Sequence, residues 1–203
     1  MIAAIEDAIL AHLAAARPSL PYKIVEMDSY AGQLDEQLDQ VIRRMPAVWV
    51  AFAGAARPKP VGTSKTRFRV DATFAVMHGA RNPRGEKFTR HSLEVGGQIT
   101  EVGAYRILQD VGALLLRQDF AASGLEIEPL SPGKITTLYN TRLANQAMAV
   151  FAQEWHTAWV LTLPAQPLDP LNPDALWTAL GIHYHLTPDD GLEDAVDNIS
   201  LSV

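Results

Sequence analysis

Residues 65–78 read KTRFRVDATFAVMH and alternate apolar with polar side chains almost without a break. The apolar positions are Phe68, Val70, Ala72, Phe74 and Val76, and the positions between them carry Arg67, Arg69, Asp71 and Thr73. Successive side chains of a β-strand point to opposite faces, so this pattern predicts a long strand with one face on a hydrophobic core. The other face is then left for solvent or a partner.

Further strands are predicted on both sides of this stretch. Residues 47–54 lie within AVWVAFAGA, which is apolar on both faces and therefore typical of a central strand in a covered sheet. Shorter extended segments predict strands near 22–27 and 134–139, and residues 146–163 predict a second long strand. Together they predict a mixed or antiparallel sheet of about five strands.

Three helices are predicted around this sheet. Apolar residues recur at helical spacing within 2–16, 34–44 and 100–119, and Thr100 is the predicted N-cap of the last helix. Residues 81–98 are rich in Gly, Pro and basic side chains, which predicts a long exposed loop. The predicted fold class is therefore α+β, with two or three helices covering the sheet.

The chain changes character at Pro164. All the predicted elements of the α+β domain fall within residues 1–163. After them, prolines recur every three residues, at Pro164, Pro167, Pro170 and Pro173. Such spacing favours a stiff extended segment. We therefore expect a domain boundary here and, over 164–203, a Pro-rich, acidic C-terminal arm with a short helix near 174–180 and a strand near 182–186.

Composition excludes several classes of protein. The absence of cysteine excludes disulfide frameworks, thiolate zinc sites and cysteine nucleophiles. Glu6, Asp7 and His12 interrupt the apolar N-terminal run, which argues against a secretion signal, and no uninterrupted apolar run reaches the roughly 18 residues of a membrane span. We expect a protein made in the cytoplasm that has no membrane partner.

The net charge of −6 hides two regions of opposite sign. Nine of the 17 basic residues lie between Arg57 and Arg90 with only two acidic residues among them, and eight acidic residues but no basic one follow Arg142. The candidate partner-facing residues are Arg67, Arg69, Arg81, Arg84, Lys87 and Arg90 on the basic side, with Asp189, Asp190, Glu193 and Asp194 on the acidic arm. Basic clusters attract DNA phosphates, whereas opposed charges on identical chains favour head-to-tail rings. Contact between subunits is the favoured interpretation, and DNA contact remains open.

Glu154 and His156 lie two residues apart within AVFAQEWHTAW, residues 149–159. In a strand they share one face, and Trp155 and Trp159 point to the other. Catalysis would also need a nucleophile or a metal, plus a group that orients the imidazole, and no motif marks either. An exposed or subunit-facing pair is the favoured interpretation.

His183 and His185 form an HxH pair that can offer two nitrogens to a metal ion, but no third ligand lies at a recognisable position. An ordinary polar edge strand is therefore favoured. GGQITEVG and VGTSKT both depart from the glycine patterns of nucleotide-binding loops. We expect neither a metal nor another cofactor.

Several ordered blocks carry a family resemblance. They are MIAAIEDAILAHL, MPAVWVAFAGA, GAYRILQDVGALLL with LEIEPLSPGKI after it, and QAMAVFAQEWHTAW. In this succession, over roughly residues 1–163, the chain resembles the Mu-like prophage tail proteins that are similar to tail terminators of long-tailed phages. None of the blocks is a catalytic signature, and the arm after Pro164 has no counterpart in the resemblance.

The resemblance implies a small α+β subunit that forms a ring, expected to be hexameric, at the head-proximal end of the finished tail tube. Such a ring stops growth of the tube, contacts tube or sheath protein, and offers a docking surface to the neck or head-completion proteins. It implies a structural protein of the virion tail rather than an enzyme, assembled in the host cytoplasm. Whether the basic residues also contact phage DNA in passing stays open.

Three alternatives remain open at this point. A head-completion or connector subunit would share the ring but bind the portal side. A metal-dependent hydrolase would use Glu154, His156, His183 and His185. A free-standing DNA-binding protein would use the basic residues, and its binding would weaken steeply with salt.

Overall fold

The computed structural model describes residues 1–32, 43–82, 84–143, 146–163, 179–184 and 195–200. The chain divides into two compact units, Met1–Thr162 and Leu163–Val203. Except for its last two positions, the helix predicted at 34–44 lies outside the described residues.

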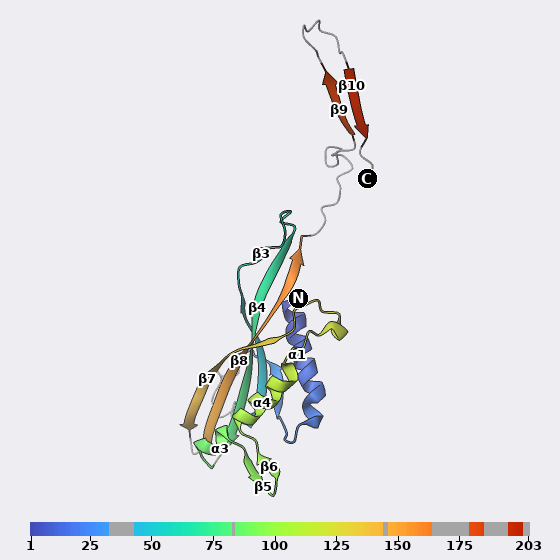
Figure 1. The fold of residues 1–203 in the computed structure, drawn as a ribbon. Helices are drawn as coiled ribbons and strands as arrows, with labels where there is room; N and C mark the ends of the chain where they lie inside the picture. Colours follow the sequence, from blue (N-terminus) through green and yellow to red (C-terminus); the bar gives the residue numbers. More distant parts are fainter. Residues whose placement is uncertain (33–42, 83, 144–145, 164–178, 185–194, 201–203) are drawn as a thin grey trace. The chain divides into compact units, whose positions relative to one another are not determined.

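One long sheet forms the frame of Met1–Thr162 (Figure 1). Its strands, in spatial order, are β1 (Glu26–Ser29), β2 (Ala47–Ala55), β4 (Arg67–Asn82), β8 (Gln146–Thr162) and β7 (Ser131–Leu143), and the short β3 (Lys59–Pro60) pairs with the start of β4. β1 runs parallel to β2, and the other neighbouring strands are antiparallel. The sheet is therefore mixed, and the predicted α+β class is confirmed.

The two longest strands, β4 and β8, pair along their whole lengths. Their register runs without a shift from Arg67 opposite Thr162 to Asn82 opposite Ala147. The predicted strands at 65–78 and 146–163 correspond to them. A strand as long as β4 spans roughly 50 Å, whereas a helix of 12 residues spans only about 18 Å. The sheet therefore extends well beyond the helices that cover it.

Two helices cover one face of the sheet, α1 (Ile2–Ala16) and α4 (Ala104–Leu115). Both present apolar side chains at helical spacing, and the fully or almost fully buried ones are Ile5, Ile9, Leu13, Ile107, Val111 and Leu115. The sheet contributes Phe74 and Trp155 to the same core, both almost completely buried. The helices cover one face of β4, which explains why apolar and polar residues alternate in its sequence.

The opposite face carries a smaller hydrophobic cluster at one end of the sheet. Its members are Met45, Ala47, Trp49, Met77, Met148 and Val150. Trp49 is fully buried there and donates a hydrogen bond from Nε1 to Glu26 Oε1 at 2.7 Å. Beyond this cluster, towards the far ends of β4 and β8, the helix-free face becomes increasingly exposed.

The prediction of a long exposed loop at 81–98 is wrong. β4 continues to Asn82, and α3 (Glu86–Arg90) and the hairpin of β5 (Leu93–Val95) and β6 (Gln98–Glu101) follow. The hydroxyl of Thr89 is buried and shares its hydrogen between the carbonyl oxygens of Gly85, at 3.1 Å, and of Ala147 in β8, at 3.3 Å. A contact distant in sequence thus holds α3 in place, and local composition does not reveal it.

The start of the last helix was also predicted wrongly. Thr100 lies in β6, where its hydroxyl donates to the carbonyl oxygen of Leu93 at 3.0 Å, and α4 begins only after Gly103.

Similarly, β1 begins later than the predicted strand at 22–27. Tyr22 lies outside the sheet and donates its hydroxyl to Asp110 Oδ2 at 2.9 Å; burial and this carboxylate raise the pKa of Tyr22.

Within Leu163–Val203, the described residues form an antiparallel hairpin of β9 (Ala179–Tyr184) and β10 (Ala195–Ser200). The predicted strand near 182–186 overlaps β9, and β10 was not predicted. Most of the helix predicted at 174–180 lies outside the described residues, but its last two positions belong to β9, so that end of the prediction is wrong. In the described part of the chain, none of the helices has the length and apolar character to cross a membrane.

Candidate functional site

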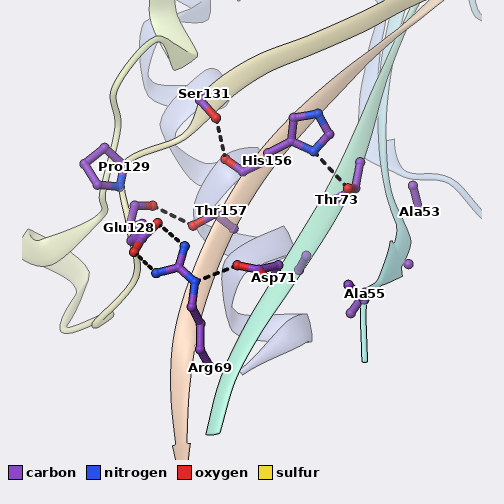
Figure 2. A pocket seen from close by; sticks show the side chains of 13 residues that line it. Ala53, Ala55, Arg69, Asp71, Thr73, Glu128, Pro129, Ser131, His156 and Thr157 are labelled. Atoms are coloured by element: carbon purple, nitrogen blue, oxygen red, sulfur yellow. Dashed lines mark hydrogen bonds and ion pairs between the residues drawn. The ribbon is translucent and has the colours of Figure 1, made fainter. Parts of the chain in front are cut away.

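An open hollow of about 560 Å³ lies beside the exposed part of the sheet, where β2 ends and β4 and β8 continue (Figure 2). Its polar lining comes from three places: β4 contributes Arg69, Asp71 and Thr73, β8 contributes His156 and Thr157, and the segment before β7 and its first residue contribute Glu128 and Ser131. Small residues of the β2 end, from Ala53 to Ala56, form the remaining wall. The register shift between Phe52 and Gly54 lies at this edge of the hollow.

Arg69 is held by two carboxylates. Its Nε donates to Asp71 Oδ1 at 2.7 Å, and its terminal nitrogens donate to both oxygens of Glu128, with Nη2 to Oε2 at 2.6 Å. Lys59 Nζ lies 3.4 Å from Asp71 Oδ2. Hydrogen bonds to the two carboxylates raise the pKa of Arg69, and the guanidinium lowers the pKa of Asp71 and of Glu128. The charges of this cluster are therefore largely satisfied by one another.

The ion pair of Arg69 with Glu128 crosses over β8. Asp71 lies opposite Ala158 in the ladder, and the backbone nitrogen of Glu128 donates to the carbonyl oxygen of Ala158 from the other edge of β8. Ala158 is only 3% exposed although it belongs to the helix-free face. A small side chain at this position leaves room for the arginine to pass, so the bridge ties β4 to the segment that leads into β7.

His156 is fixed by its neighbours but remains about half exposed. Its Nδ1 is 3.0 Å from the hydroxyl oxygen of Thr73, and Nε2 is 4.0 Å from Glu154 Oε2. The Ser131 hydroxyl donates to the backbone oxygen of His156 at 3.3 Å, not to its ring. Gly133 lies directly against the imidazole, because a Cβ at that position would be 2.3 Å from Nε2. The structure thus places Glu154 and His156 side by side on the face opposite the buried Trp155 and Trp159, as the alternation indicated.

This arrangement offers little to catalysis. The Glu154 carboxylate is beyond hydrogen-bond distance of the imidazole, so it does not orient the ring as the third group of a triad does. The Ser131 hydroxyl is engaged by a carbonyl oxygen, which leaves the ring without that nucleophile. Among the described residues, no three His, Asp or Glu side chains gather closely enough to hold a metal ion.

The basic residues singled out from the sequence do not form one surface. Arg67 and Arg69 lie near one end of β4 and Arg81 lies near the other, about 45 Å away along the strand. Arg84 lies just before α3, and Lys87 lies within it. Arg84 Nε is 3.4 Å from Glu101 Oε1. Arg90 closes α3. The basic stretch of sequence therefore divides into two regions at opposite ends of the sheet, and Arg69 is already paired within one of them.

Several sequence candidates cannot be placed beside these residues. Asp189, Asp190, Glu193, Asp194 and His185 lie outside the described residues, and His183 belongs to β9 of the second unit. The HxH pair and the acidic arm contacts therefore remain predictions.

Sequence reasoning missed one feature of the surface. Beyond the helix layer, β4 and β8 continue as a two-stranded ribbon with β3 beside it (Figure 1). Val160 and Leu161 are consecutive residues of β8 and thus point to opposite faces, yet they are 41% and 53% exposed. Val61, next to β3, is 39% exposed. We call these three residues the ribbon tip; its signal in the sequence is the run VLTL, where the alternation of β8 ends.

A long sheet covered by helices on one face, a hollow whose charges are paired, and an apolar ribbon tip are the main features of this α+β fold. The family model described as Bacteriophage Mu, Gp37 matches residues 1–160. The chain therefore belongs to this family and is a structural, tail-related phage protein, which confirms the resemblance to Mu-like phage proteins. Comparison with curated proteins finds no match to the chain.

Proposed function

We propose that the protein is a tail terminator. Copies of the chain form a ring, six in number by the resemblance, on the head-proximal end of the tail tube. The ring stops growth of the tube and offers the docking surface for the neck proteins, and it becomes part of the virion tail. Family membership supports a structural phage role, and the ribbon tip is the observation that supports docking onto a partner.

The ribbon tip favours a partner because it cannot cover itself. A two-stranded ribbon has no second layer, and here both of its faces carry a large exposed apolar side chain. Val160 and Leu161 are already about half buried, so covering one of them completely stabilises a contact by roughly 1 kcal/mol. One subunit would hold weakly, but a ring repeats the contact at every subunit, and linked contacts multiply their effect. This suits a protein that must bind an assembled tube end in preference to a single tube subunit.

Ring closure is supported by the charge distribution. The region around α3 carries the basic residues Lys87 and Arg90, whereas residues 164–203 carry seven acidic residues and no Lys or Arg. A contact between two different surfaces of identical chains generates a closed ring when the rotation between neighbours closes. In such a ring, Lys87 and Arg90 face either the neighbouring copy or the lumen that phage DNA crosses.

The test uses a phage that lacks the gene, complemented in the host with variants of the full chain. Leu161→Glu places a charge in the ribbon tip, and Leu116→Glu is the matched control, because Leu116 is 50% exposed at the end of α4. Tail lengths are measured by negative-stain electron microscopy. We expect uniform tails with the wild-type chain and with Leu116→Glu, and overlong tails without heads attached with Leu161→Glu.

Uniform tails in the complete absence of the protein contradict the proposal. So does finding the protein, by antibody-gold labelling, on filled heads without tails and not on headless tails; that result identifies a head-completion or connector subunit. Retention on DNA that falls steeply with salt, for a chain that never joins tails, identifies a free-standing DNA-binding protein.

A further inference from the structure

β7 leaves one edge of the long sheet without a strand partner among the described residues. Two register shifts, between Pro132 and Ile135 and between Thr137 and Tyr139, interrupt its first part. Shifts of this kind distort an edge and protect it from pairing. From Tyr139 to Leu143, however, the pairing with β8 is regular. This second half of β7 therefore presents a regular row of backbone N–H and C=O groups on which another strand can pair.

The β9–β10 hairpin is a sheet of only two strands among the described residues. A two-stranded hairpin by itself is marginally stable in water, and it becomes stable when a third strand or another layer is added. The sequence of β9, ALGIHY, places apolar residues at every second position, which is the pattern of a strand that is covered on one face. The hairpin thus has the character of an element that completes its packing on another sheet.

Charge indicates where that sheet edge lies. Residues 164–203 carry seven acidic residues and no Lys or Arg, so the hairpin unit favours a basic neighbour. α3, with Lys87 and Arg90, packs against both β7 and β8. The hydrogen bond from Thr89 to Ala147 fixes α3 at the end where Ala147 pairs with Arg142, in the regular half of β7. The free edge and the cations therefore coincide.

The reach of the chain favours a neighbouring copy over the same copy. The regular half of β7 lies opposite Gln146–Val150, whereas the chain leaves β8 at Thr162, about 40–50 Å further along the strand. Residues 164–178 span at most roughly 50 Å even when fully extended. Return to the same sheet thus requires a nearly straight segment, and the entropy lost in straightening it disfavours the same copy.

From this juxtaposition, and resting on the proposed ring, we propose that the β9–β10 hairpin of one copy adds to the regular half of β7 in a neighbouring copy, beside α3. β10 is the strand that pairs, because it carries Asp197, the acidic residue of the two strands. Strand addition links each copy to the next in one direction, which is the contact that a closed ring needs.

Cross-linking of the full chain tests this directly, because the chain contains no cysteine. One sample carries Thr141→Cys in β7, a second carries Asn198→Cys in β10, and the two are mixed and treated with a short bis-maleimide. We expect a cross-linked dimer that contains one copy of each variant, by mass spectrometry. The control pairs Asn198→Cys with Gln109→Cys, an exposed position on α4, and should give no such product. Absence of the mixed dimer overturns the proposal, as does a double variant that cross-links only within one copy.

Charge reversal provides a second measurement. Lys87→Glu with Arg90→Glu should weaken self-association, followed by light scattering, by on the order of fivefold or more, and added salt should reduce the difference. The control Arg57→Glu with Lys65→Glu makes the same change in charge near the other end of β4 and should leave association nearly unchanged. Equal effects of the two pairs contradict the placement beside α3.

These results separate the inference from the function on which it rests. If the mixed dimer fails to form but tails are still capped at uniform length, the strand addition is wrong and the terminator stands. If the mixed dimer forms but tails stay overlong, the strand addition stands and the terminator is wrong.

Discussion

His78 lies on the helix-covered face of β4 and is completely buried. Neither of its ring nitrogens has a hydrogen-bond partner among the described residues, and its ladder neighbours are Val48 and Phe151. Burial lowers the pKa of His78 from 6.5 to about 3. The folded protein therefore holds this imidazole neutral at pH values where the unfolded chain binds a proton.

The sign of the resulting pH dependence follows from that difference. Above pH 6.5 the imidazole is neutral in both states, and the contribution to stability is constant. Between about pH 6.5 and pH 3 only the unfolded state gains the proton, so the free energy of unfolding falls by roughly 1.4 kcal/mol per pH unit. At pH 5 the expected loss is about 2 kcal/mol, which lowers the melting temperature by roughly 4–8 °C in a domain of this size.

The assay compares thermal and urea unfolding of the wild-type chain and of His78→Leu between pH 7 and pH 5. Leucine has similar bulk and no unpaired nitrogen, so the variant should be as stable as the wild type at pH 7 or more stable. The carboxylates contribute equally to both proteins, so the difference between their two pH profiles isolates His78. Val48→Ala is the control: it should lower stability by about 1–3 kcal/mol at every pH and leave the slope as it is.

Identical pH slopes for the wild type and His78→Leu would refute this reasoning. A steeper slope in Val48→Ala would do so as well, because it would assign the pH dependence to general loosening of the core.

Three glycine substitutions test the packing. Gly103→Ala should destabilise the protein by more than about 3 kcal/mol in urea unfolding, because its Cβ would lie 2.5 Å from the carbonyl oxygen of Arg90; full stability would contradict the placement of α3 against α4. Gly112→Ala, near the end of α4 with only ordinary contacts, should stabilise by about 0.5–1 kcal/mol, and a loss in the same assay would contradict it. Gly133→Ala should displace the ring of His156, seen as a shift of its imidazole NMR signals, and unchanged signals would show that the ring lies elsewhere.

The long strands and the first helix were predictable because their patterns are local. In β4 buried and exposed side chains alternate over many residues, and α1 repeats its apolar residues at helical spacing. The sequence pattern itself therefore shows which side chains are buried. AVWVAFAGA similarly indicated β2, which lies between two other strands.

The segment from Asn82 to Gly103 was not predictable by the same reasoning. α3 has five residues, too few for a periodic pattern, and the buried hydroxyl of Thr89 holds it through a contact with β8. The basic residues of this segment suggested that it is exposed to solvent, although α3 within it packs against the sheet.

The hollow was predictable only in part. Alternation placed Glu154 and His156 on one face, but the partner of Arg69 is Glu128, which comes from an irregular segment far away in the sequence. Charge in a single sequence shows which residues are basic and not which of them are already paired. The ribbon tip was missed for a related reason, because exposure of Val160 and Leu161 depends on where the helix layer ends.

The position of the protein in the particle is the most direct test of the terminator proposal. Cryo-electron microscopy of headless tails and of complete particles should show a closed ring of this chain between the last tube ring and the neck, with the ribbon tip against the tube. A ring on the portal side with the tube end bare, or density for this chain along the whole tube, would contradict the account.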